Sequence, residues 1–331
     1  MRIGASATRG SMLPAPTRIR AIDWLRGLAV LLMIQTHALA LLRPELRSGA
    51  LFDSLQWVDG LVAPSFILAA GFSMALTQVR AASAPGAAEA RRRRMLRTLR
   101  RLGEVLLVGI LVNWMWFPIF REPRWIVRMD ILPCVGLSLL LALPMLFALA
   151  PYPRALRWAS LLLAAAVFGV SPLAEPLGPP WNRFLNHHSD AVFPLLPWAG
   201  YVYLGAAIGS ATAEEGRRGA AVWLGALAAA GIVVWSLTPW FAALYPPHDG
   251  SAAVRFVEVF GTSSLAGYFF HEMLLFFRVF GFSFEARWGK SCSWPQYAAL
   301  TILLAACTFV LTWMTARIYA AVEQRATAAA A

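Results

Sequence analysis

The chain has 331 residues, of which 59% are hydrophobic and only 14% are charged. Because a soluble globular domain carries about 25% charged residues, this composition excludes a soluble enzyme and indicates an integral membrane protein. The formal net charge of +12 is also typical of nucleic-acid-binding proteins. Here, however, the arginines gather between apolar runs, as in the cytoplasmic loops of membrane proteins. We therefore predict an all-α, polytopic bundle with membrane lipids, and no nucleic acid, as partners.

Nine apolar runs are long enough to cross a bilayer. The connection between the second and third runs, residues 78–101, holds eight arginines and one glutamate. The positive-inside rule places this connection, and the N-terminus with it, in the cytoplasm. The runs lie at about 24–43, 57–77, 102–120, 131–150, 155–172, 191–210, 220–241, 257–280 and 296–319.

The number of crossings is nine or ten. Nine would leave Arg317 and Arg325 on the outer side, which the positive-inside rule disfavours. Either a tenth crossing lies within residues 220–280, or the tail departs from the rule. The expected organisation is one transmembrane domain between a disordered cytoplasmic N-terminus and a disordered tail, with boundaries 1–17, 18–322 and 323–331.

The first apolar run carries ionisable side chains on one helical face. Arg26 and His37 are eleven residues apart, which returns a helix to within about 20° and separates them by about 16 Å along the axis. Asp23 lies one turn before Arg26. Because charge in lipid is costly, this face should line a cavity. His37 is either a neutral histidine bonded across helices or a group that moves protons, for which imidazole is well suited.

Two further segments carry polar groups inside apolar runs. Asp59 begins the second run and either caps a helix N-terminus or faces the cavity. In residues 261–278, the helical period places Ser264, Tyr268, His271 and Arg278 within about one 60° sector. This stripe should face the first run, either as part of a site or as a ladder of interhelical hydrogen bonds.

The remaining candidates are weaker. His187, His188 and Asp190 precede the sixth run, but no further residue has the spacing of a zinc ligand. The three cysteines also lack metal or redox spacing. We therefore predict no metal site. The arginine run within 78–101 suits anionic lipid or the phosphates of a cytoplasmic donor.

Five segments occur in a fixed order along the chain: IDWLRGLAVLLMIQTHAL, WVDGLVAPSFILAAGFSMAL, RMDILPCVGLSLLLAL, FPLLPWAGYVYLGAAIG and GTSSLAGYFFHEMLL. In these segments, and over about residues 18–280, the chain resembles bacterial membrane proteins related to heparan-alpha-glucosaminide N-acetyltransferase. The spacing of Arg26 and His37 is also similar to the arginine/histidine motif of the acyltransferase-3 family.

The resemblance implies a multispan acyltransferase and a late histidine-glutamate pair at His271 and Glu272. There is one departure. The heparan enzyme carries asparagine at the position of His37 and its active histidine in the loop before the second span, whereas residues 43–56 here contain no histidine. Either His37 takes over that role, or the chemistry differs.

We predict transfer of an acyl group, expected to be acetyl, from cytoplasmic acyl-CoA to a hydroxyl or amine of a carbohydrate or glycolipid on the far side of a bacterial inner membrane. Acetyl-CoA would be a co-substrate, no cofactor would be bound permanently, and an oligomer is compatible with the sequence. The alternatives are a proton-coupled transporter or flippase and a structural membrane protein. The candidate residues are His37, Asp59 and His271 for catalysis, Arg20, Asp23, Arg26, Arg93, Arg94 and Arg97 for the donor, and Ser264, Tyr268 and Asp190 for the acceptor.

Overall fold

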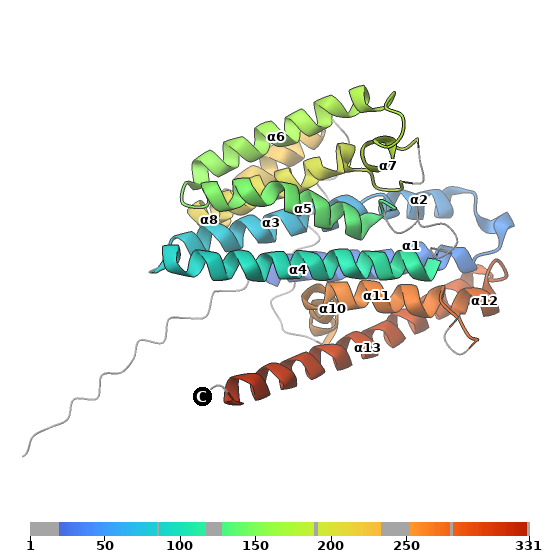
Figure 1. Ribbon diagram of the computed structural model, residues 1–331. Helices are drawn as coiled ribbons and strands as arrows, with labels where there is room; N and C mark the ends of the chain where they lie inside the picture. The colour runs from blue at the N-terminus through green and yellow to red at the C-terminus, as the bar shows by residue number, and fades with distance from the viewer. Residues whose placement is uncertain are drawn as a thin grey trace, which may run out of the picture.

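The computed structural model describes residues 20–84, 86–116, 128–188, 191–232, 252–278 and 281–329. Across these ranges the regular elements are helices (Figure 1), which confirms the predicted all-α class. Two short 3₁₀ turns, η1 (Leu39–Leu41) and η2 (Pro44–Leu46), connect the first two helices. The helices are α1 (Arg20–Ala38), α2 (Ala50–Asp59), α3 (Val62–Ala82), α4 (Ala87–Trp116), α5 (Ile131–Leu149), α6 (Pro153–Ala174), α7 (Asn182–Leu185), α8 (Leu195–Ile232), α10 (Ala252–Thr262), α11 (Ser264–Leu275), α12 (Phe284–Trp288) and α13 (Trp294–Ala329).

Five helical segments of the described chain are long and apolar enough to cross a membrane. The protein is therefore a polytopic helical membrane protein, as predicted. Other predicted runs fall in helices of mixed character: α4 begins with the arginine run, and α8 is interrupted at Gly216, which has a φ of 66°. The five segments are Ile22–Leu41, Ala50–Ala82, Ile131–Leu149, Pro153–Ala174 and Trp294–Val322.

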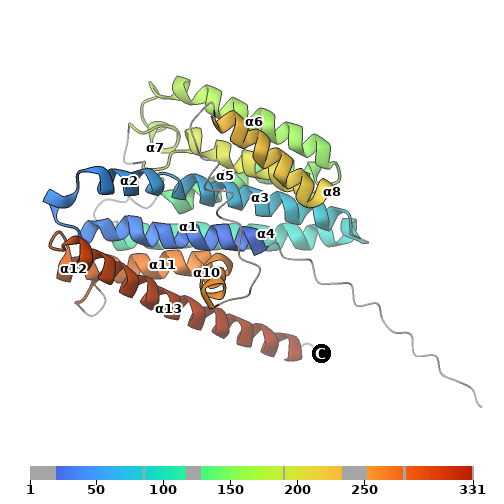
Figure 2. The same ribbon diagram turned by 180° about the vertical axis from the view of Figure 1, so that it is seen from behind.

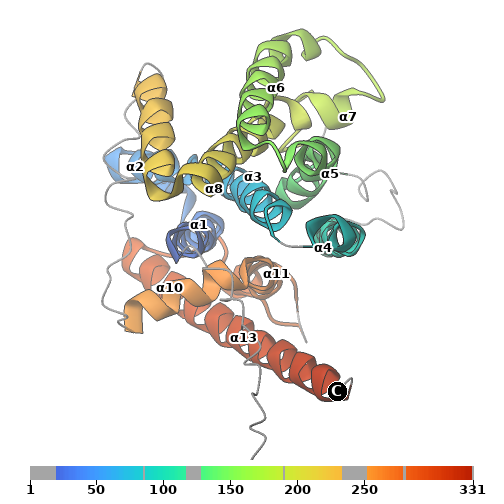
Figure 3. The ribbon, with the colours of Figure 1, turned by 90° about the vertical axis from the view of Figure 1, so that its left-hand side faces the viewer.

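Helix α1 lies at the centre of the bundle. Seen end-on, it has α3 on one side and α10, α11 and α13 on the other (Figure 3). Helices α4, α5, α6 and α8 are arranged around α3. Helix α1 therefore packs against other helices on two sides (Figure 3), and Asp23, on its ionisable face, is buried.

Glycines allow the central helices to approach closely. A Cβ atom at Gly71 of α3 would meet the backbone carbonyl of Val202 in α8, and one at Gly205 of α8 would meet the carbonyl of Leu68. Gly261 of α10 lies against the backbone of α1 in the same way. Small residues at helix crossings are the usual means of packing in a membrane, where there is no hydrophobic driving force between helices.

The predicted run at 257–280 is not one helix. Helix α10 ends at Thr262 and α11 begins at Ser264, and in Figure 3 α10 lies across the bundle while α11 is seen end-on. Glycine, serine and threonine around this junction favour a break because they are weak helix formers. Helix α11 ends at Leu275, and Arg278 follows it as an exposed residue. The prediction that Arg278 continues the polar stripe is therefore wrong.

The two ends of the bundle differ in charge. The junction of α3 and α4, with the arginine run, marks one end, which we call the arginine-rich end; α2, α7 and α12 mark the opposite end (Figure 1). The C-terminal part of α13, with Arg317, extends toward the arginine-rich end in both side views (Figure 2). Arg317 thus lies toward the same end as the arginine run, as the positive-inside rule favours. Residues 233–251, within the range considered for a tenth crossing, lie outside the described chain.

Helix α13 continues to Ala329, into the range 323–331 for which the sequence predicts a disordered tail. The alanines of this segment explain the continuation, because alanine is the strongest helix former.

Candidate active site

Two histidines and a glutamate from distant parts of the chain meet between α1 and α11. His37 lies in the last turn of α1, and its Nδ1 atom is 2.7 Å from Oε1 of Glu272 and 2.9 Å from Nε2 of His271. Nε2 of His271 and Oε1 of Glu272 are 3.5 Å apart. We call these residues the His-His-Glu cluster. The side chains of His271 and Glu272 are 0% and 2% exposed, whereas that of His37 is 32% exposed, so only His37 is open to an incoming group.

The hydrogen bonds of the cluster assign its protons. Nδ1 of His271 lies 3.1 Å from the carbonyl oxygen of Gly267, which only accepts hydrogen bonds. Nδ1 therefore carries the proton, and Nε2 of a neutral His271 is an acceptor. Nδ1 of His37 faces two acceptors, this Nε2 and the Glu272 carboxylate, and so it carries a proton too. The remaining nitrogen of a neutral His37, Nε2, is then free to accept a proton from a reactant.

Asp59 lies beside the cluster at the C-terminal end of α2. Both of its carboxylate oxygens are buried and accept no hydrogen bond from the described residues. The hydroxyl of Thr36, which also lies close to the Asp59 carboxylate, donates to the carbonyl oxygen of Leu32 at 2.9 Å. Because Asp59 ends α2 and does not cap α3, the predicted capping role is wrong. A buried carboxylate without a partner is costly, which makes Asp59 a candidate for binding a ligand.

Asp130 lies close enough to the cluster to interact electrostatically with His37 and Glu272. Its carboxylate accepts a hydrogen bond from the backbone N–H of Ile131 and caps α5. Burial raises the pKa of Asp130 above its usual value, and the hydrogen bond from Ile131 and the positive charge of Arg128 offset this effect only in part. The negative charge of Glu272 raises the same pKa further, so the two carboxylates are close enough to interact.

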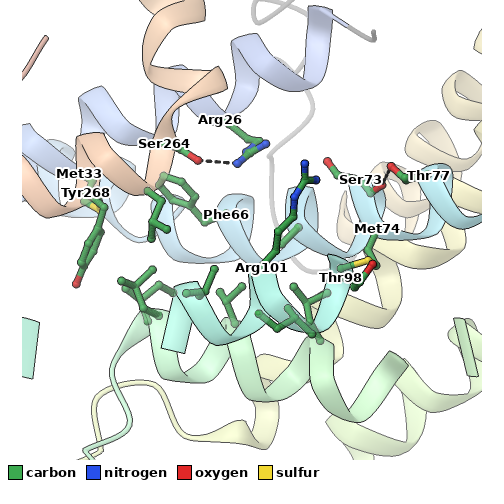
Figure 4. A pocket seen from close by; sticks show the side chains of 18 of the residues that line it. Arg26, Met33, Phe66, Ser73, Met74, Thr77, Thr98, Arg101, Ser264 and Tyr268 are labelled. Carbon is green, nitrogen blue, oxygen red and sulfur yellow. Dashed lines mark hydrogen bonds between the residues drawn. The ribbon is translucent and has the colours of Figure 1, made fainter. Parts of the chain in front are cut away.

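A pocket of about 280 Å³ opens between α1, α3, α4, α5 and α11 (Figure 4). Arg26 and Arg101 both line it, and Figure 4 shows their side chains directed toward the same part of the pocket. Arg26 donates a 2.6 Å hydrogen bond to the hydroxyl of Ser264. Most of the other lining residues are apolar. The pocket thus combines two guanidinium groups with an apolar wall.

The pocket reaches to within one helical turn of the cluster. Its lining includes Met33, four residues before His37, and Tyr268, three residues before His271. Both side chains are buried, and the rings of Tyr268 and His271 are 5.5 Å apart. His37 itself does not line the pocket. Met33 and Tyr268 therefore separate the arginine-lined pocket from the cluster.

The structure brings several predicted residues together. His37 and His271 are in contact, and Arg26, Ser264 and Tyr268 line the pocket, so the prediction that Tyr268 and His271 turn toward the first run is confirmed.

Other candidates lie elsewhere. Asp23 is buried beside α10, Arg93 and Arg97 are exposed, and Arg94 donates to the carbonyl of Ala87 without lining the pocket. Asp190 and the side chain of Arg20 lie outside the described chain.

Glu272, Asp130 and Arg101 belong to the site although none of them is among the candidate residues: the sequence marks Glu272 only through the resemblance and Arg101 only as a member of the arginine run, and it does not mark Asp130. The sequence resemblance singled out Glu272, but helical spacing places it about 100° from His271 and off the predicted stripe. Arg101 belongs to an arginine run that is explained by topology. Asp130 stands between two apolar runs, and nothing in its spacing points to His37.

The site thus has the partly exposed His37 beside Glu272 and His271 at one end and a pocket lined by Arg26 and Arg101 at the other. The family model described as the catalytic part of heparan-alpha-glucosaminide N-acetyltransferase matches residues 18–245, which is more than half of the chain. The protein therefore belongs to this family of membrane acetyltransferases. The match includes His37, Arg26, Asp59 and Arg101 but ends before α11. No curated protein and no solved structure matches the chain significantly.

Proposed function

We propose that the protein transfers an acetyl group from acetyl-CoA to a sugar-type acceptor, with His37 as the general base. The observation that carries the proposal is the pairing of His37 with Glu272. The 2.7 Å contact orients the imidazole, compensates the positive charge that it gains with a proton, and leaves its Nε2 atom free. Buried ionisable groups within a membrane bundle usually mark a functional site, and the family is one of acetyltransferases.

The donor is proposed to occupy the pocket between Arg26 and Met33. Guanidinium groups bind phosphate in a bidentate manner, so Arg26 and Arg101 would hold the phosphates of CoA at the arginine-rich end, which we assign to the cytoplasm. The apolar wall suits the flexible pantetheine arm. The thioester would then point toward Met33 and Tyr268, whose side chains must separate to admit it to His37.

The acceptor is proposed to arrive at the opposite end, beside Asp59. A buried carboxylate without a partner is stabilised by a cation, so Asp59 would bind the protonated amine of an amino sugar. The ion pair between the Asp59 carboxylate and a protonated amine would distinguish an amine acceptor from a hydroxyl acceptor. The amine first loses one proton to solvent and becomes a nucleophile.

The transfer itself is a single displacement in this proposal. As the acceptor nitrogen attacks the thioester carbon, its remaining excess proton passes to Nε2 of His37. The carbon–sulfur bond then breaks, and the imidazolium returns the proton to the sulfur of CoA. Glu272 holds His37 in place throughout and stabilises the imidazolium. General-base catalysis of this kind contributes about 10²- to 10⁴-fold to the rate.

A direct test uses purified protein with acetyl-CoA and glucosamine. We expect N-acetylglucosamine and free CoA in equal amounts. A ligand present at about 100 times its Kd stabilises the folded state by about 2.7 kcal/mol, so CoA should raise the Tm, and acetyl-pantetheine, which lacks the nucleotide phosphates, should raise it less. A protein that is neither stabilised by CoA nor able to acetylate any of several sugar amines or hydroxyls would contradict the proposal and favour the transporter alternative.

A further inference from the structure

The three facing atoms of the His-His-Glu cluster have the spacing of metal ligands. Nδ1 of His37, Nε2 of His271 and Oε1 of Glu272 are separated by 2.7, 2.9 and 3.5 Å. A point about 2 Å from all three atoms exists just outside their plane, and about 2 Å is the usual bond length from zinc to imidazole nitrogen and carboxylate oxygen. Among the described residues, these three side chains lie close enough together to hold one metal ion.

The surroundings of the cluster support the same conclusion. Nδ1 of His271 donates to the carbonyl of Gly267, which turns the lone pair of Nε2 toward the other two ligands, as in most histidine metal sites. His271 and Glu272 are almost fully buried, whereas His37 is 32% exposed, so a water molecule has access to a fourth position. Two imidazoles and one carboxylate suit zinc and similar transition metals, and they do not suit magnesium or calcium, which prefer oxygen ligands.

We propose that the His-His-Glu cluster binds a zinc-class divalent ion and that the bound ion switches off acetyl transfer. The inhibitory part rests on the proposed function, whereas the metal site does not. A metal on Nδ1 of His37 leaves the ring proton on Nε2, because a neutral imidazole keeps one proton. Because Nε2 then carries that proton, it has no free lone pair with which to take a proton from the sugar amine. The metal-bound form and the general-base form of His37 therefore exclude each other.

This inference reverses the expectation, drawn from sequence spacing, that the chain has no metal site. The two ligand-bearing helices are more than two hundred residues apart in the sequence, so no local motif reveals the cluster. The adjacent histidines that do suggest a metal motif are different: His188 pairs with Glu175 at an exposed position.

The test measures binding to metal-free purified protein directly. Cobalt(II), followed by its visible absorption, and zinc, followed by calorimetry, should each bind with one equivalent. His271→Ala and Glu272→Ala should each weaken zinc binding by more than about 100-fold, the upper end of the loss caused by removing an outer-shell partner. The matched control, His188→Ala, removes a surface histidine that also faces a glutamate at 2.9 Å and should bind as the wild type does.

Two measurements keep the proposal falsifiable if a cluster variant fails to fold. X-ray absorption of the zinc-loaded wild type should show nitrogen and oxygen ligands; a sulfur shell would place the ion at the free cysteines and overturn the site, as would the absence of stoichiometric binding. In the transfer assay, zinc should inhibit at the concentrations at which it binds, and a chelator should restore the rate. An active enzyme that keeps its rate with zinc bound would refute the exclusion, whereas an inactive protein that binds zinc would leave the site intact and refute the proposed function instead.

Discussion

The contact between His37 and Glu272 allows a quantitative prediction for Glu272→Gln. The substitution keeps the size of the side chain but removes the charge that faces Nδ1 of His37 at 2.7 Å. A hydrogen bond to a charged group contributes about 1.5–3 kcal/mol, and 1.4 kcal/mol corresponds to about a tenfold change in rate. If the interaction develops fully only when His37 is protonated, kcat should fall by about 10- to 100-fold.

The prediction concerns kcat and not donor binding, because Glu272 does not line the pocket. The KM for acetyl-CoA and the Tm shift caused by CoA should therefore stay close to the wild-type values. Glu285→Gln is the matched control, since Glu285 is an exposed glutamate on α12. A folded Glu272→Gln protein with wild-type kcat, or one in which only the KM for acetyl-CoA rises, would refute the assignment of Glu272 as the positioning residue for His37.

Three other predictions test the acceptor side, the packing and the topology. Asp59→Asn should lower kcat/KM for glucosamine by at least about tenfold and leave CoA binding unchanged. Asp53→Asn, on the exposed part of the same helix, should change neither. If the two substitutions lowered kcat/KM equally, Asp59 would be removed from the site. Gly71→Val should destabilise the fold by about 1–3 kcal/mol, because its side chain would meet a backbone carbonyl of α8; an unchanged melting temperature would contradict the close crossing. Cysteines introduced as Glu89→Cys and His187→Cys should label from opposite sides of the membrane, over a low background because two of the three native cysteines are buried; labelling of Glu89→Cys in intact cells would invert the sidedness.

The sequence predicts much of the site because two of its parts follow the helical period. Arg26 and His37 share a face of one uninterrupted helix, so their alignment follows from spacing alone. His271 is the only histidine within residues 261–278. Because a polar group in lipid is costly, it should be buried against another helix that carries polar groups. These two arguments together predict that the two histidines lie close to each other, as they do in the structure.

The rest depends on tertiary structure. The break between α10 and α11 changes the direction of the chain at Ser263, and weak helix formers alone do not fix where such a break falls. Glu272 reaches His37 although it lies off the polar stripe, because a long side chain is not confined to the face of its own Cα atom. Arg101 becomes a pocket residue only through the packing of α4 beside α1 and α5, which no local pattern encodes.

The central claim is that His37 takes the proton of the sugar amine, whereas CoA is held by the arginine-lined pocket. The substitution His37→Asn tests this claim most directly. Asparagine keeps hydrogen bonding and approximate size but accepts no proton at neutral pH. Acetyl transfer to glucosamine by purified His37→Asn should fall by about 10²- to 10⁴-fold, with CoA affinity close to that of the wild type. Arg26→Ala, measured beside it, should instead weaken CoA binding. A well-folded His37→Asn protein that transfers acetyl groups at the wild-type rate would contradict the account.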